Sequence, residues 1–236
     1  MTFDYAVASD QGPRAENEDS VGVWPLKNGG LAIAVADGLG GHIGGKRASA
    51  MAIEMFGEAI KEALEPDLGD IARKIHYALR REQGLAPQMR NMATTFSAAV
   101  VDGTKIKIVH SGDTRVVLQR GSGIKKLTED HTEAQRLLRS GTITKDEFAN
   151  YPRKNVLESA LGTHFNPTID VLTEDLFRRD RIFLSSDGVH GKVSLKELKA
   201  ISDRSPNAEM FVRDVVDTVR ARRPDDNFTI AAVFAI

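Results

Sequence analysis

Cysteine is absent from this chain of 236 residues, and a strongly biased net charge is absent as well. Without a thiol the chain has no disulfide, no thiolate zinc site and no cysteine nucleophile. The formal net charge of −1 gives no basic field for nucleic acid or for an anionic membrane surface. No segment approaches the roughly 18 apolar residues of a membrane span, and the first residues lack the pattern of a secretion signal. We therefore expect a cytoplasmic protein with no nucleic-acid and no membrane partner.

The residues that are present have the composition of a globular protein, with 41% hydrophobic and 28% charged side chains. Apolar runs typical of strands occur at residues 3–8, 31–36, 95–101, 105–109, 115–118, 168–172, 181–184 and 227–234. Helical periodicity is found at residues 46–64, 68–83 and 207–222. Because the helices cluster instead of alternating with strands, we expect a layered α+β fold.

No repeat, linker or shift in composition divides the chain, so residues 1–236 are predicted to form a single domain. The segment 133–155 is more polar than its surroundings and contains the breakers Gly141 and Pro152. We interpret this segment as an element inserted at the surface.

The stretch VADGLGGHIGGKRAS follows a predicted strand and resembles a phosphate-binding loop at first sight. Residues 40–46 match the first seven positions of G-x-x-x-x-G-K, but Arg47 stands where that motif needs Ser or Thr to hold magnesium. Asp37 at the end of the strand would also repel a phosphate. A carboxylate in this position suits a cation.

Aspartates recur where predicted strands begin or end, each beside Gly or Asn. Any one of them is an ordinary turn former, but four or more that met at one edge could not all ionise without cations between them. Oxygen ligands select magnesium, manganese or calcium, and a pair of such ions suits hydrolysis of a phosphoester by a hydroxide-like bridging water. The candidates at the strand edges are Asp37, Asp113, Asp187 and Asp226, and the first loop adds Arg14, Glu18 and Asp19.

A set of short motifs runs nearly from end to end of the chain: RAENED, VADGLGGH, ATTFSAAV, GDTRVVL, LTEDHT, ESALG, FLSSDG and DDNFTI. With these motifs in this order, the chain resembles the metal-dependent protein serine/threonine phosphatases of the PP2C (PPM) family, in their compact bacterial form. The resemblance implies an α+β fold, a four-layer α-β-β-α sandwich of two antiparallel sheets flanked by helices. It also implies Mn²⁺ or Mg²⁺ as cofactor, with two core ions and a third, weaker position.

The resemblance assigns the metal ligands residue by residue. Asp37 would bridge both core ions, and the backbone carbonyl of Gly38 would be a further ligand. Asp187 and Asp226 would complete the coordination of the first ion, and Glu18 that of the second. The resulting activity is hydrolysis of phosphoserine and phosphothreonine in proteins by a metal-bridged hydroxide.

Other positions receive roles from the same resemblance. Asp113, together with Asp187, would form the third metal position. Asp19 would orient metal-bound water, and Arg14 would bind the substrate phosphate. The segment 133–155 falls where the family has its flap, which lies beside the active site and affects substrate choice.

The chain departs from the family pattern at two positions. Leu39 stands where some members place a histidine that is proposed as general acid, and His42 follows three positions later. We predict a role for His42 as proton donor, and His190, also beside an expected ligand, is a second candidate for a catalytic or supporting role. Ala93 replaces a glycine that often precedes the paired threonines, from which we expect only a change in packing.

Asp225 and Asp226 compete for one ligand position in RRPDDNFTI. Successive side chains of an extended segment point to opposite faces, but both faces of the strand that follows are apolar, so alternation does not choose between them. The family pattern does, because its ligand is the aspartate immediately before asparagine. We therefore expect Asp226 to be the ligand and Asp225 to be a solvated turn residue.

The expected partners are phosphorylated proteins, the products of a Ser/Thr kinase, and we expect a monomer. Two other functions stay open. One is a catalytically silent module that binds phosphoproteins, whose mark would be the loss of a metal carboxylate. The other is a phosphatase of small molecules, which comparison of phosphopeptides and metabolites as substrates would separate.

Overall fold

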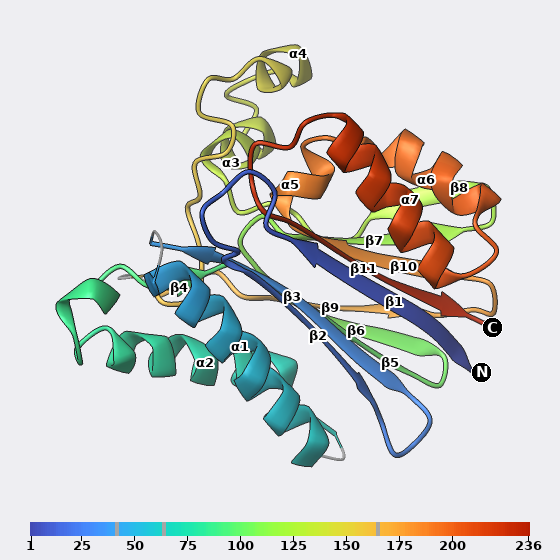
Figure 1. Cartoon of the computed structure of the whole chain (residues 1–236), viewed down its shortest axis with the longest axis horizontal. Coiled ribbons are helices and arrows are strands. Elements are labelled where there is room, and N and C mark those ends of the chain that lie inside the picture. Colours follow the sequence, from blue (N-terminus) through green and yellow to red (C-terminus); the bar gives the residue numbers. More distant parts are fainter. Residues whose placement is uncertain (41–42, 63–64, 164–165) are drawn as a thin grey trace.

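The computed structural model describes residues 1–40, 43–62, 65–163 and 166–236, and two sheets lie at its centre (Figure 1). Neighbouring strands pair antiparallel throughout the part of the chain that the structure describes. The first sheet runs in the order β1 (Phe3–Asp10), β11 (Phe228–Ala235), β10 (Arg181–Ser185), β7 (Arg115–Arg120) and β8 (Gly123–Lys126). The second runs in the order β2 (Asp19–Pro25), β3 (Leu31–Leu39), β5 (Phe96–Asp102), β6 (Lys105–Ser111) and β9 (Asp170–Asp175), and the short β4 (Ala93–Thr94) pairs with the end of β3.

Helices cover the outer face of each sheet (Figure 1). The helices α1 (Ile43–Glu62) and α2 (Leu68–Glu82) pack on the second sheet, and α6 (Leu195–Arg204) and α7 (Ala208–Ala221) pack on the first. Pairs of aromatic rings lie at these contacts: Phe56 of α1 meets Phe96 of β5, and Phe211 of α7 stacks on Phe183 of β10 with ring centroids 4.3 Å apart. The predicted four-layer α-β-β-α sandwich is confirmed.

The strand β11 is central to its sheet, and all eight of its residues are buried. Phe228 and Ile230 belong to the core beneath the helices, whereas Ala231 and Val233 belong to the core between the two sheets. Both faces of the strand are therefore covered, which is why its sequence is apolar except for Thr229.

Several elements differ from the expectation. The edge strand β2 was not predicted, because it contains Gly22 and Pro25 and is only half-buried along most of its length. The helix α6 was also not predicted, although Ser194 and Glu197 form a capping box at its start. The strand β9 begins at Asp170 instead of residue 168. The end of the first predicted helix, residues 63–64, lies outside the described residues.

The segment 133–155 contains two short helices, α3 (Glu133–Arg139) and α4 (Lys145–Ala149), which lie beyond one edge of the sandwich (Figure 1). Arg153 and Tyr151 both donate hydrogen bonds to the carboxylate of Glu133, at 2.7 and 2.6 Å. These bonds join the end of the segment to its beginning. The short 3-10 helix η1 (Pro87–Met89) lies in the connection between α2 and β4.

Antiparallel pairing brings the aspartate-bearing strand ends to one edge of the sandwich. The last residue of β1, Asp10, pairs with the first of β11, and Asp19 at the start of β2 pairs with Asp37 near the end of β3. The helix α5 (Asp187–His190) follows β10 directly at the same edge. None of the described helices combines the length and the apolar character that crossing a membrane requires.

Candidate metal centre

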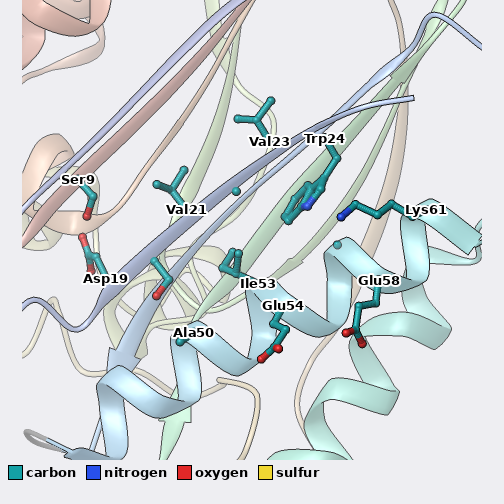
Figure 2. A pocket seen from close by; sticks show the side chains of 13 residues that line it. Ser9, Asp19, Val21, Val23, Trp24, Ala50, Ile53, Glu54, Glu58 and Lys61 are labelled. Atoms are coloured by element: carbon teal, nitrogen blue, oxygen red, sulfur yellow. The ribbon is translucent and has the colours of Figure 1, made fainter. Parts of the chain in front are cut away.

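A cavity of about 260 Å³ lies at this edge, and all six predicted metal ligands line it. The ligands come from the ends of several strands, so residues far apart in the chain face one space. The lining includes Arg14, Glu18, Asp37, Gly38, Asp113, Asp187 and Asp226. Asp19 is not part of this lining. It lies at one end of a neighbouring groove along β2, where Ser9 faces its carboxylate (Figure 2).

The carboxylates of this cavity are strained electrostatically. Burial raises the pKa of Asp37 well above its ordinary value, and the charges of Asp19, Asp187, Asp113 and Asp226 raise it further. Burial, followed by the charge of Asp187, raises the pKa of Asp113 to about 7. The pKa of Asp187 is raised by burial and then by Asp226. Such crowding of buried like charges is relieved when cations bind between them, so the donor set fits hard divalent ions.

Asp37 is held in place through hydrogen bonds of its backbone. The Oγ1 of Thr95 accepts a hydrogen bond from the Asp37 amide at 3.0 Å, and the Thr94 hydroxyl and the Thr95 amide donate to the Asp37 carbonyl, each at 2.9 Å. The paired threonines of ATTFSAAV thus fix the position of Asp37. Ala93 before them is buried and forms β4, so the departure from glycine is accommodated in the packing.

Two glycines allow the start of α1 to approach the ligands. The Gly38 amide donates to the Glu18 carbonyl at 3.1 Å, and a Cβ on Gly38 would collide with the backbone of Gly45. A Cβ on Gly45 would in turn collide with the carboxylate of Glu18. Gly38 and Gly45 therefore allow the helix and the strand to approach each other closely.

Asp19 has a supporting hydrogen bond from Ser186, whose hydroxyl donates to Oδ2 of Asp19 at 2.7 Å. The same hydroxyl oxygen accepts the Thr229 amide at 2.9 Å. Burial raises the pKa of Asp19 to about 6, and the charge of Asp187 adds to the rise. Ser186 therefore belongs to the site through Asp19, a role that sequence reasoning missed because the pair of serines in FLSSDG has no distinct pattern.

Asn227 is a second residue that sequence reasoning missed. Its side-chain oxygen accepts the Glu18 amide at 2.9 Å, and its amide group donates to the carbonyls of Gln11 and Glu16 at 2.7 and 2.9 Å. One buried side chain thus fixes the whole loop that carries Arg14 and Glu18. The signal was present in the sequence as the asparagine of DDNFTI, but spacing alone gives it no partner.

Arg14 does not extend freely into the cavity, because its guanidinium donates to Oδ2 of Asp226 at 2.6 Å. Asp225 points away and pairs with Lys192 at 2.9 Å, with 83% of its side chain exposed. The structure therefore places Asp226 at the cavity and Asp225 outside its lining.

Within the described ranges, no three acidic or histidine side chains stand close enough together to enclose an ion by themselves.

Of the two histidines considered for a catalytic or supporting role, the structure describes only His190. His42 lies outside the described residues. His190 is buried, and its Nε2 forms a hydrogen bond with the carbonyl oxygen of Asp113 at 3.1 Å. Burial lowers the pKa of His190 to about 3, so the ring is neutral at physiological pH and holds the backbone of the Asp113 turn.

A larger cavity of about 610 Å³ opens beside the carboxylates, between them and the segment 133–155. Phe148, Lys154 and Asn155 line it from that segment, and Asp113 and Asp187 line it from the sheet edge. This space is adjacent to the smaller cavity and shares residues with it.

The chain is similar to known proteins both in sequence and in structure. A family model described as "Protein phosphatase 2C" matches residues 10–229. The serine/threonine phosphatase stp of Listeria welshimeri is 31% identical over 93% of this chain and 90% of its own length. The serine/threonine protein phosphatase PstP of Mycobacterium tuberculosis is also 31% identical, over 98% of this chain and 45% of its own length.

The chain is also similar in structure to solved serine/threonine phosphatases. The crystal structure of the M. tuberculosis serine/threonine phosphatase PstP/Ppp superposes with a TM-score of 0.90 at 28% identity, covering 100% of this chain and 99% of that one. The catalytic domain of PstP in complex with two manganese ions gives a TM-score of 0.86 at 28% identity, with 99% of both chains covered.

Proposed function

Since the chain belongs to the protein phosphatase 2C family, we propose that it hydrolyses phosphoserine and phosphothreonine in proteins, with divalent metal ions as cofactor. The observation that carries the proposal is the cavity at the sandwich edge, where buried carboxylates from separate strand ends raise one another's pKa. The match of the family model to residues 10–229 supports one catalytic domain over residues 1–236.

The residues that would hold the ions are those with oxygen atoms on the cavity. Asp37 would be shared between two ions of Mn²⁺ or Mg²⁺, with Asp187 and Asp226 on one side, and Glu18 and the Gly38 carbonyl on the other. Asp113 and Asp187 would hold a third, weaker ion. When bound, such ions act as Lewis acids and lower the pKa of nearby water toward neutrality.

The protein's own groups prepare the substrate and the attacking water. Asp19, fixed by Ser186, has an acceptor oxygen with which to orient a water molecule. Arg14 is the residue for the substrate phosphate, because a guanidinium binds two phosphate oxygens with parallel hydrogen bonds. Its present partner is the carboxylate of Asp226, so a phosphate dianion competes for a guanidinium that is already placed at the cavity.

The larger cavity leaves room for the polypeptide on either side of the phosphorylated residue. In this proposal the segment 133–155 is the flap, and Phe148 and Lys154 face the substrate. His42 is the proposed donor of the proton to the leaving group. The enzyme acts as a cytoplasmic monomer on proteins that a Ser/Thr kinase has phosphorylated.

The test compares three substrates under one condition: a phosphothreonine peptide, p-nitrophenyl phosphate and a set of phosphorylated metabolites, all with manganese. We expect release of phosphate from the peptide with the highest kcat/KM. Asp37→Asn should abolish this activity, and Asp225→Asn, a change of the same size at a residue that lines the larger cavity but not the smaller one, is the control for loss of the metal site. Efficient turnover of a metabolite with none of the peptide would refute the assignment to protein substrates, and binding of the peptide without turnover would refute catalysis.

A further inference from the structure

The turn that carries Asp113 joins β6 to β7 and depends on Gly112. This glycine has φ of +113°, a conformation that other residues rarely adopt. A Cβ on Gly112 would approach the Cβ of Thr95 to 2.6 Å, so the turn packs closely against Thr95, the residue before β5. The direction of the Asp113 side chain is therefore set by how this turn is held.

His131 forms two hydrogen bonds with Gly112, one to its carbonyl and one from its amide. The backbone amide of His131 donates to the Gly112 carbonyl at 2.7 Å, and the Gly112 amide donates to Nδ1 of the His131 ring at 3.2 Å. Since Nδ1 accepts, the proton of the neutral ring is on Nε2, which lies 3.0 Å from Oδ2 of Asp170. Asp170 is the first residue of β9, so the ring connects the turn to a neighbouring strand.

The ring of His131 is well enclosed, with 10% of its side chain exposed. It lies against the buried ring of His110, at 4.7 Å between centroids. The carbonyl of His131 accepts the Glu158 amide at 2.8 Å, which fixes the backbone position from which the side chain extends. Neither ring nitrogen has a contact with the carboxylates of the cavity among the bonds of the described residues.

We infer that His131 is a positioning residue for Asp113, and that it acts through the hydrogen bond from the Gly112 amide to its Nδ1. Without this bond the turn keeps the contact of His190 with the Asp113 carbonyl. The amide of Gly112, the residue before Asp113, is then no longer held by the ring. The carboxylate of Asp113 would then meet the third ion with a less defined geometry. The inference rests on the proposed function, because it takes Asp113 as a ligand of that ion.

Three substitutions separate this role from general packing. His131→Asn places its side-chain oxygen near the position of Nδ1 and keeps an acceptor for Gly112. His131→Gln extends its amide toward Asp170 and does not place an acceptor at the Nδ1 position. His131→Ala removes both contacts. If His131 served only to fill space, His131→Gln would preserve Mn²⁺ binding at least as well as His131→Asn.

His76 provides a matched control within the same chain. Its Nδ1 accepts the amide of Gly162 at 3.1 Å, and Gly162 also has positive φ, at +90°. The bond has the same chemistry, but neither residue lines the metal cavity. His76→Ala therefore measures the cost of losing such a bond where no ligand depends on it.

The first measurement is amide hydrogen exchange of Gly112 by NMR in chelator, which requires no bound metal. We expect protection in the unsubstituted protein and in His131→Asn, and faster exchange in His131→Gln and His131→Ala. The second is calorimetric titration with Mn²⁺. The weakest site should lose affinity by about 10- to 100-fold in the Gln and Ala variants, the usual range for residues that support a ligand, while His131→Asn and His76→Ala stay within about 3-fold of the unsubstituted chain.

The inference is overturned if His131→Ala, shown to be folded by circular dichroism, keeps both Gly112 protection and the weakest Mn²⁺ affinity. It is also overturned if His131→Gln keeps the affinity of the weakest Mn²⁺ site and His131→Asn loses it. This second comparison still decides the question if the Ala variant does not fold. Failure of the proposed function looks different, because the unsubstituted chain would then bind no Mn²⁺ and hydrolyse no phosphopeptide. That result would overturn both.

Discussion

Asp113→Asn is expected to stabilise the metal-free protein, and to do so more at pH 8 than at pH 5. The carboxyl of Asp113 titrates near 3.8 in the unfolded chain and at about 7 in the folded one, because it is buried beside Asp187. Between these values the unfolded state binds fewer protons than the folded state, so stability falls as the pH rises. The full cost is roughly 4 kcal/mol above pH 7 and about 2 kcal/mol at pH 5, at 1.36 kcal/mol for each unit of pKa. Removing the carboxylate should therefore gain about 2 to 3 kcal/mol more at pH 8 than at pH 5.

Urea unfolding in chelator, followed by the fluorescence of Trp24, the single tryptophan, measures this difference directly. Buried His110 and His190 also titrate in this range, but their contributions are present in both proteins and cancel in the comparison. Asp225→Asn is the control, since Lys192 and other contacts lower the pKa of Asp225 and no gain is expected. Saturating Mn²⁺ should abolish the advantage of Asp113→Asn. An effect equal at both pH values, or a loss of stability at pH 8, would refute the reasoning.

Three further substitutions test individual contacts of the site. Asp226→Ala should lower kcat at least a hundredfold and weaken Mn²⁺ binding in calorimetry, whereas Asp225→Ala should change both by less than about tenfold, and the opposite ranking would reject the assignment. Arg14→Ala should raise KM for a phosphopeptide at least as clearly as it lowers kcat, because a guanidinium binds ground-state phosphate too, and unaltered constants would exclude it. Gly45→Ala, whose Cβ collides with the Glu18 carboxylate, should weaken Mn²⁺ binding by about tenfold or more while the chain stays folded, and unchanged binding would show that Glu18 is no ligand.

The layered fold was accessible from the sequence because its central elements are strongly patterned. Residues 31–36 are apolar throughout, and the eight buried residues of β11 contain Thr229 as their single polar side chain. The apolar stripe that contains Phe56 is continuous. The edges were less accessible. The strand β2 faces solvent along one side, so its residues need not alternate, and its existence depends on pairing with β3.

The carboxylates of the site could be named from the sequence, since each stands at a strand end, but their supports could not. Asn227 and Ser186 act through partners more than forty residues away, and only the folded chain brings them to Glu18 and Asp19. The pairing of Arg14 with Asp226 is likewise a consequence of geometry. Residue type at a turn predicts which groups can bind a metal, whereas the bonds that orient them depend on tertiary contacts.

The central claim is that these buried carboxylates hold divalent ions without which no phosphoester is cleaved. Equilibrium dialysis with Mn²⁺, combined with phosphate release from a phosphothreonine peptide in the same samples, tests it most directly. The account predicts that activity appears only as two ions bind per chain, and that Asp37→Asn loses both the ions and the activity while remaining folded. Full activity in excess chelator, or full activity and metal binding in Asp37→Asn, would contradict it.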